Sequence, residues 1–246
     1  MNHAAINRLI VALDVETAGE ARELFQALKD VAGMFKIGSQ LFTAAGPDIV
    51  REIVKAGGRV FLDLKFHDIP NTVAAAGVEA TRLGVSIFNV HALGGSEMMR
   101  RTAGSVAETA EREGVERPSV IAVTMLTSAD NATLAEVGIS PDAEAQVSRL
   151  ACLAAECGLD GVVASPHEVA LVREAVKPRE FLIVTPGVRP TGFTADDQKR
   201  VMTPAEAIRA GADYLVVGRP ILNAPDPVRA ALKISEEMGK AVASRQ

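Results

Sequence analysis

Cysteine is scarce in this sequence, long apolar runs are absent, and basic residues do not outnumber acidic ones. Cys152 and Cys157 are the only two cysteines among 246 residues, and no histidine spacing beside them is typical of a zinc site. No run approaches the roughly 18 consecutive apolar residues of a membrane span, and no basic and then apolar leader opens the sequence. We therefore expect a cytoplasmic protein with no membrane partner, whose cysteines are small core residues in a reducing compartment.

Acidic residues exceed basic ones, 31 to 26, which gives a formal net charge of −5 at pH 7. A nucleic acid or an anionic membrane is held by a basic face, so this balance argues against both as partners. An anionic small molecule still fits the chain, provided that cations gather locally around it.

Short apolar runs rich in β-branched residues recur along the chain, and each is followed by a helical pattern. The runs are residues 9–14, 35–38, 60–65, 86–91, 120–124, 161–165, 181–185 and 214–218. Helical spacing is clear over residues 17–31, 48–56 and 143–157, and glycines stand where helices should stop.

Eight such units, with no linker between them, predict an α/β protein with a single domain over residues 1–246. A closed (β/α)8 TIM barrel is the architecture that this regular alternation favours. The alternative is an open, doubly wound sheet, which is weakened because no glycine-rich dinucleotide fingerprint follows the first strand. Active sites of such barrels lie at the carboxyl ends of the strands, so the residues at those ends are the candidates.

The segment of residues 61–72 carries charged residues into the end of an apolar strand. Because side chains along a strand alternate between faces, Asp63 and Lys65 are expected to point the same way. Charges in that position are costly unless they are paired, so together with Asp68 they indicate an acid–base array held for chemistry. An ordinary ion pair at a strand end is the alternative interpretation.

Polar residues also end other predicted strands. They are Asp14 after strand one, Lys36 in strand two, Asn89 and His91 in strand four, and Thr127 and Ser128 after strand five. A histidine at a strand end is more often a hydrogen-bonded support than a catalyst, and we expect this of His67 and His91.

The last predicted strand runs into Gly218, Arg219 and Pro220, which together indicate a phosphate site. Gly218 lets the backbone approach a ligand, a short helix that begins near Arg219 presents N–H groups, and the guanidinium adds donors. Loops seven and eight are where such barrels most often hold phosphate. The long loop of residues 186–202 is a candidate lid over that phosphate. The alternatives are a simple turn with a surface charge, and a disordered insertion.

At these positions the chain resembles the orotidine 5'-phosphate decarboxylase family over essentially its full length. The motifs that carry the resemblance are ALD (12–14), FKIG (35–38), DLKFHDIPNT (63–72), NVHA (89–92), LTS (126–128), TPGVRP (185–190), DQ (197–198) and VGRP (217–220). The resemblance implies a carboxy-lyase of pyrimidine biosynthesis. Its reaction would convert orotidine 5'-monophosphate to uridine 5'-monophosphate (UMP), the last step of de novo UMP synthesis.

By this resemblance, four catalytic residues form an alternating charged network: Lys36, Asp63, Lys65 and Asp68. Lys65 is then the proton donor. The resemblance also implies a homodimer, in which Asp68 and Thr72 reach into the site of the partner subunit.

The same resemblance assigns residues to the nucleotide substrate. Asp14 and Lys36 would bind the ribose hydroxyls, Asp63 would lie beside the departing carboxylate, and Thr127 would meet the pyrimidine. The phosphate would be held by Arg189, Gln198, Gly218 and Arg219.

The chemistry of that reaction agrees with these residue types. Loss of CO₂ from orotate leaves an anion in the plane of the ring, outside the π system, where an electron-sink cofactor offers little help. A positioned cation is the natural substitute, and neighbouring Asp63 and Asp68 favour the protonated form of Lys65. We therefore expect that neither a metal ion nor an organic cofactor is needed.

Two other functions fit parts of the sequence. Metal-dependent sugar-phosphate lyases and synthases of the same barrel group resemble this chain in carrying Asp-x-Lys-x-x-Asp after strand three. They place an acid at the end of strand two, however, where this chain has Lys36. A catalytically silent phosphate-binding barrel is the second alternative, although every charged member of the proposed array is present.

Overall fold

The computed structural model describes residues 3–177, 180–190 and 202–243. In this part of the chain eight parallel strands close into a barrel, in which each strand pairs with the next and β8 pairs with β1. The strands are β1 (Leu9–Ala12), β2 (Met34–Gly38), β3 (Val60–Phe66), β4 (Ile87–His91), β5 (Ser119–Val123), β6 (Gly161–Val163), β7 (Leu182–Pro186) and β8 (Tyr214–Val217). The closed barrel confirms the predicted (β/α)8 architecture and excludes the open sheet.

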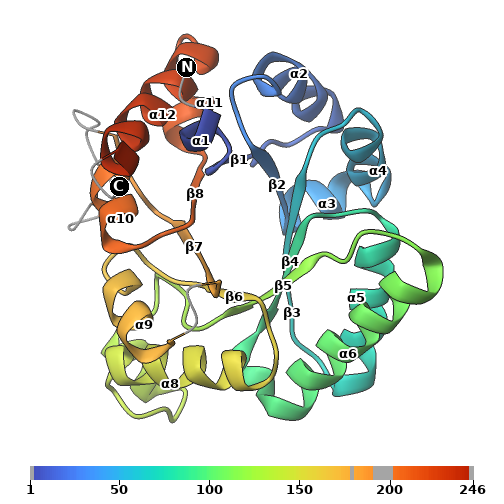
Figure 1. The fold of residues 1–246 in the computed structure, drawn as a ribbon, viewed down its shortest axis with the longest axis vertical. Coiled ribbons are helices and arrows are strands. Elements are labelled where there is room, and N and C mark those ends of the chain that lie inside the picture. Colours follow the sequence, from blue (N-terminus) through green and yellow to red (C-terminus); the bar gives the residue numbers. More distant parts are fainter. Residues whose placement is uncertain (1–2, 178–179, 191–201, 244–246) are drawn as a thin grey trace.

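Helices surround the strands on the outside (Figure 1). They are α1 (His3–Ile6), α2 (Ala18–Leu28), α3 (Ser39–Ala45), α4 (Asp48–Lys55), α5 (Pro70–Arg82), the 3-10 turn η1 (Ala92–Gly94), α6 (Gly95–Glu113), α7 (Asn131–Glu136), α8 (Ala143–Glu156), α9 (Val169–Ala175), α10 (Pro204–Ala210), α11 (Arg219–Leu222) and α12 (Pro227–Ala243). The helical stretches expected near residues 17–31, 48–56 and 143–157 correspond to α2, α4 and α8. Within the described residues, none of these helices combines the length and the apolar character that crossing a membrane requires.

Local sequence signals explain where several helices begin. Thr17 caps α2 and Thr203 caps α10, and each exchanges reciprocal bonds with a glutamate three residues later. Pro70 occupies the first turn of α5, where its missing N–H costs no helical hydrogen bond. This proline fixes where the loop after β3 ends, and that loop carries Asp68.

One small apolar cluster fills the barrel interior. Its members come from inward-facing strand positions: Ile10, Ala12, Met34, Phe61, Ile87, Ile121, Val184 and Val216. The intervening strand residues face the helices and belong to the larger outer core. Because side chains alternate, Lys36 follows Met34 and Asp63 follows Phe61 into the barrel. The apolar cluster thus forms the floor beneath charged side chains.

Strand β3 departs from regular geometry where its charged residues lie. Leu62 pairs with Phe88 of β4 and Phe66 pairs with Val90, so three residues of β3 stand against one of β4. Within this irregular stretch Lys65 has a φ of 53°, the only positive φ of a non-glycine residue in the described chain. The two charged side chains of this strand meet as predicted, but strand alternation alone does not bring them together.

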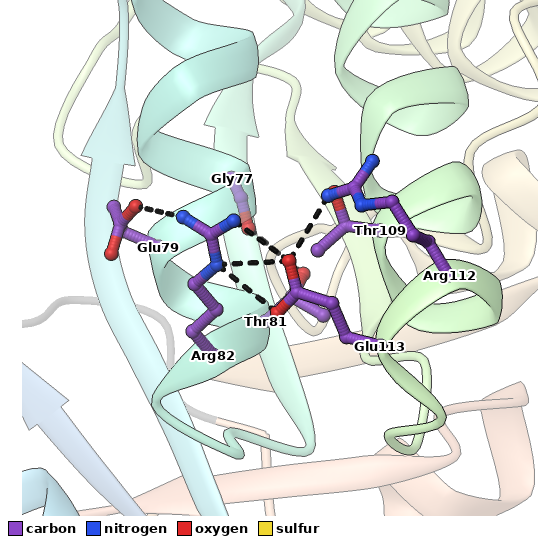
Figure 2. A network of polar contacts seen from close by, with 7 residues as sticks. All are labelled: Gly77, Glu79, Thr81, Arg82, Thr109, Arg112 and Glu113. Carbon is purple, nitrogen blue, oxygen red and sulfur yellow. Dashed lines mark hydrogen bonds and ion pairs between the residues drawn. The ribbon is translucent and has the colours of Figure 1, made fainter.

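Helices α5 and α6 are joined at their last turns by a network of ion pairs (Figure 2). Arg82 donates to Glu113 through Nε at 3.1 Å and through its NH2 group at 2.7 Å, and its NH1 group donates to Glu79 at 2.7 Å. Arg112 also donates to Glu113, at 3.0 Å. The hydrogen bonds from Arg82, and then those from Arg112, hold the pKa of Glu113 at about 2. Each of these helices returns the chain to the start of the next strand, so the network lies on the side of the barrel away from the strand carboxyl ends.

We predict that Glu113→Gln lowers the stability of the fold in a pH-dependent way. The lowered pKa means that the ionised carboxyl favours the folded state, fully above its ordinary value of 4.5 and progressively less as the pH falls toward 2. Melting temperatures measured from pH 7 downward should therefore differ most from wild type near neutrality and converge in acid. Glu111→Gln, at an exposed position on the same helix, is the control. A wild-type melting temperature for Glu113→Gln at pH 7 would contradict the prediction.

Candidate functional site

A cavity of about 350 Å³ opens at the carboxyl ends of the strands. Eight of the predicted site residues line it: Asp14, Lys36, Asp63, Lys65, Thr127, Arg189, Gly218 and Arg219. Its apolar wall is formed by side chains that sequence reasoning did not single out, among them Phe61, Met125, Val163 and Val216. Gln198, and with it most of the candidate lid, lies outside the described residues. The cavity therefore combines an apolar wall with several charged groups, as small-molecule sites commonly do.

Four side chains of alternating charge run across the cavity. Lys36 Nζ lies 2.8 Å from Asp14 Oδ1 and 3.5 Å from Asp63 Oδ2. Lys65 Nζ lies 2.7 Å from Asp63 Oδ1. The side chains of Lys36 and Asp63 are only 10% and 13% exposed, which is tolerable because each charge has an opposite neighbour. Three members of the predicted catalytic network are thus adjacent in one chain.

Asp63 is the centre of this chain of charges. Besides the two ammonium groups, its Oδ1 accepts a hydrogen bond of 2.7 Å from Asn89 Nδ2. The amide oxygen of Asn89 accepts in turn from the backbone N–H of Lys65, at 2.8 Å. The sequence placed Asn89 at the end of strand four without a role, because the register between β3 and β4 cannot be read from the residues.

Gly38, at the end of β2, makes room for the Lys36 ammonium. A Cβ atom built at this position would lie 3.0 Å from Lys36 Nζ and 3.5 Å from Asp14 Oδ1. A side chain here would therefore press on the ammonium group and on its carboxylate partner. The FKIG motif thus supplies both a cation and the space in which that cation sits.

Arg189 and Arg219 contribute guanidinium groups to the wall that the loops after β7 and β8 form. Arg189 and Arg219 both line the cavity, and helix α11 begins at Arg219 as predicted. The pKa of Arg189 is lowered, first because the group is partly buried and second because the charge of Arg219 is near. A bound anion would relieve the repulsion between these two cations, so this wall is suited to a phosphate group.

Asp68 and Thr72 do not line the cavity of their own chain. Both are exposed, at the loop before α5 and in its first turn, and Asp68 Oδ1 accepts a hydrogen bond from the Ile69 N–H at 2.6 Å. Ile69 itself is 66% exposed, which is unusual for a large apolar side chain. The fourth member of the predicted network therefore stands on an exposed rim, apart from the other three.

His67 and His91 lie beside each other, with ring centroids 5.4 Å apart and ring planes tilted by 36°. Neither lines the cavity. Burial lowers the pKa of His91, and the nearby charges of His67 and Lys65 lower it further, so the neutral ring is favoured. Nδ1 of His91 is buried and has no hydrogen-bond partner among the described residues, so the expected hydrogen-bonded support is not found at this atom.

The remaining candidates carry no site chemistry. Cys157 is buried and Cys152 is half-buried, and both are free thiols. Across residues 3–177, 180–190 and 202–243, no three or more histidine, cysteine, aspartate or glutamate side chains are grouped so that they could hold a metal ion.

Comparison with known proteins extends over nearly the whole chain. The model of the "Orotidine 5'-phosphate decarboxylase / HUMPS family" matches residues 7–234. The chain is 58% identical over 234 residues to the orotidine 5'-phosphate decarboxylase of Geobacter sulfurreducens, covering 95% of this chain and 97% of that protein. It is 56% identical over 238 residues to the protein of the same name from Syntrophotalea carbinolica, covering 97% of each chain.

Solved structures agree with these sequence comparisons. The crystal structure of orotidine 5'-phosphate decarboxylase from Lactobacillus acidophilus superposes with a TM-score of 0.82 and 37% identity, covering 94% of this chain and 98% of that one. An uncharacterized conserved protein from Geobacillus kaustophilus gives a TM-score of 0.79 and 38% identity, covering 94% and 99%. The chain therefore belongs to the orotidine 5'-phosphate decarboxylase / HUMPS family.

Proposed function

We propose that this protein decarboxylates orotidine 5'-monophosphate to UMP, the last step of de novo UMP synthesis. The observation that carries the proposal is the Lys65 ammonium, held 2.7 Å from Asp63 in a cavity that Arg189 and Arg219 also line. That arrangement offers a proton donor and an anion site within one cavity. Full-length relatives that carry the name of this enzyme support the proposal.

In the proposed mechanism Lys65 replaces the departing CO₂ with a proton. As the carbon–carbon bond breaks, its electron pair stays on the ring carbon in the ring plane, and the facing ammonium stabilises that charge. Lys65 then transfers its proton to the same carbon. We further propose that Asp63 faces the substrate carboxylate, where two like charges about 3 Å apart at an effective dielectric near 20 repel by roughly 5 kcal/mol. Departure of CO₂ relieves this repulsion.

The remaining lining residues would bind the parts of the nucleotide that do not react. We assign the ribose hydroxyls to Asp14 and Lys36, and the pyrimidine edge to Thr127. The phosphate is assigned to Arg189, Gly218 and Arg219, with a role for Gln198 that stays a prediction from the sequence. Binding energy gained at the phosphate can lower the barrier of the chemical step when closure of the site depends on it.

We propose that the working form is a homodimer in which Asp68 and Thr72 complete the site of the partner subunit. Both residues are exposed and lie outside the cavity of their own chain. Three large apolar side chains on the loops after β3, β4 and β5 are also exposed, Ile69 at 66%, Leu93 at 42% and Leu126 at 44%. Apolar side chains grouped along one rim are typical of a surface that a second subunit covers. The predicted cytoplasmic location stays a prediction.

The metal-dependent sugar-phosphate lyases and synthases fit the site less well. Lys36 stands where those enzymes place an acid, and its Nζ lies 3.5 Å from Asp63 Oδ2. A divalent cation bound by Asp63 would be repelled by this ammonium at close range. A silent phosphate-binding barrel does not account for the alternating charges, whose two middle members, Lys36 and Asp63, are only 10% and 13% exposed.

The proposal is tested by adding purified protein to orotidine 5'-monophosphate and following the loss of substrate absorbance. We expect steady turnover that survives exhaustive chelation, because Lys65 supplies both the stabilising charge and the proton. Heat-denatured protein is the control. Activity that disappears on chelation and returns with magnesium would favour the sugar-phosphate class, and no turnover at all would favour the silent barrel.

Arg219→Ala should weaken the binding of UMP and also lower kcat, because the phosphate is proposed both to dock the nucleotide and to drive closure. Loss of a charge-assisted contact of this kind should cost about 2 to 4 kcal/mol in kcat/KM. Arg229→Ala, which removes an exposed arginine of α12 away from the cavity, is the matched control. Wild-type kcat/KM in the Arg219 variant would show that the phosphate site is elsewhere.

The shared site is tested by mixing two inactive variants, Lys65→Ala and Asp68→Asn. If Asp68 acts across the dimer, each mixed dimer contains one site with both residues intact and one site with neither. With random re-association of equal amounts, half of the dimers are mixed, so roughly a quarter of wild-type activity should return.

The matched control is a mixture of Lys65→Ala with Lys36→Ala. Both lysines line the cavity of one chain, so every site in that mixture lacks one of them and activity should not return. If the Asp68→Asn mixture gives no more than the average of its two parents after verified subunit exchange, Asp68 serves its own subunit.

A further inference from the structure

Asn89 occupies an inward-facing position of β4 with no exposed surface. Ile87, two residues earlier, belongs to the apolar cluster inside the barrel, so Asn89 is the next inward side chain above that floor. A buried amide is stable only when its donor and its acceptor are both satisfied. Here Nδ2 donates to Asp63 Oδ1 at 2.7 Å, and Oδ1 accepts from the Lys65 N–H at 2.8 Å.

The hydrogen bond to the Lys65 N–H replaces one that the sheet cannot supply. The regular β3–β4 register stops at Leu62 and resumes at Phe66, so the backbone between them lacks the usual ladder partners. Lys65 adopts a φ of 53°, a left-handed conformation that a residue with a Cβ atom disfavours. A side chain from the neighbouring strand therefore holds a backbone conformation that the sheet does not.

An amide satisfies both partners in one of its two orientations. The Lys65 N–H needs an acceptor and the Asp63 carboxylate needs a donor, and the two ends of an asparagine side chain provide one of each. A leucine of similar volume would provide neither. An ionised aspartate would provide the acceptor but would set a second negative charge against Asp63.

We propose that Asn89 is a positioning residue for the proton donor. It fixes the left-handed backbone of Lys65 and the orientation of the Asp63 carboxylate, and through them it aims the ammonium at the reacting carbon. Asn89 does not line the cavity, so it acts through these two neighbours and does not touch the substrate. The proposal rests on the decarboxylation proposed above.

The first test compares Asn89→Ala with Thr124→Val. Displacement of a catalytic group by about 1 Å can cost on the order of 100-fold in rate, so kcat of the Asn89 variant should fall about 100-fold. Its affinity for UMP should change little, because the nucleotide is held by other residues. Thr124 is equally buried, at the end of β5, and its hydroxyl donates only to the Val163 carbonyl at 3.1 Å. Thr124→Val should therefore keep its kcat.

Asn89→Asp supplies a second test that depends on the hydrogen bonds themselves. Its protonated carboxyl can donate to Asp63 and accept from the Lys65 N–H, as the amide does, while the ionised form cannot. The titratable groups near this position are Asp63 and Lys65 of β3, with Lys36 of β2 beyond Asp63, and His91 on the same strand. Strand β5, on the other side, carries no charged residue.

The kcat of Asn89→Asp, divided by that of the wild type at the same pH, should therefore rise as the pH is lowered. A ratio that stays flat or falls with acid would overturn the proposal, and so would a wild-type kcat in Asn89→Ala. If Asn89→Ala does not fold, the aspartate variant alone decides. Wild-type protein is measured in the same assay. If the wild type does not turn over orotidine 5'-monophosphate, the proposed decarboxylation is refuted, and the positioning role of Asn89 is not.

A crystal structure of the Asn89→Ala variant gives a readout that is independent of activity. We expect the φ of Lys65 to leave the left-handed region and its Nζ to move away from Asp63. If the φ of Lys65 and the distance from its Nζ to Asp63 both keep their wild-type values, the Asn89 amide does not hold this geometry.

Discussion

One largely buried carboxylate, that of Asp63, determines how this site is built. It must satisfy two ammonium groups, at 2.7 Å and 3.5 Å, in a cavity where little water reaches it. An unpaired charge there would be costly, and the two ammonium groups together offset it. The space at Gly38 and the amide of Asn89 both serve this arrangement. The Asp63 carboxylate, its two ammonium partners and the residues that support them therefore depend on one another.

Much of the molecule could be predicted from its sequence, because its signals are periodic. Apolar runs of strand length alternate with helical patterns, and strand ends carry polar residues, so the barrel and the charged residues that line its cavity follow directly. The irregular stretch of β3 could not be predicted, because nothing in DLKF distinguishes a regular strand from a bulged one. The role of Asn89 depends on that register and was missed with it. Asp68 follows Lys65 by three residues, yet the turn before Pro70 carries it to the exposed rim.

Ion pairs that stabilise the fold and charges suited to chemistry lie at different ends of the barrel. Arg82 and Glu113 join α5 to α6 on one side, through an ion pair of 2.7 Å between partly exposed side chains. On the other side, charges are buried beside an apolar wall, and exposed apolar residues such as Ile69 stand at the rim. Buried charges and exposed large apolar side chains thus occur together at this end, and each is unusual in a folded protein. That combination marks the carboxyl ends of the strands as the functional face without reference to any relative.

The left-handed backbone at position 65 is easiest for glycine, whereas the proposed chemistry requires a lysine there. Glycine adopts this conformation freely, whereas lysine adopts it only with support from its neighbours. Selection for heat resistance alone would accept glycine at position 65, while selection for turnover would keep the lysine. A laboratory lineage evolved without its substrate would thus be expected to lose its chemistry first at this position, with the barrel left intact.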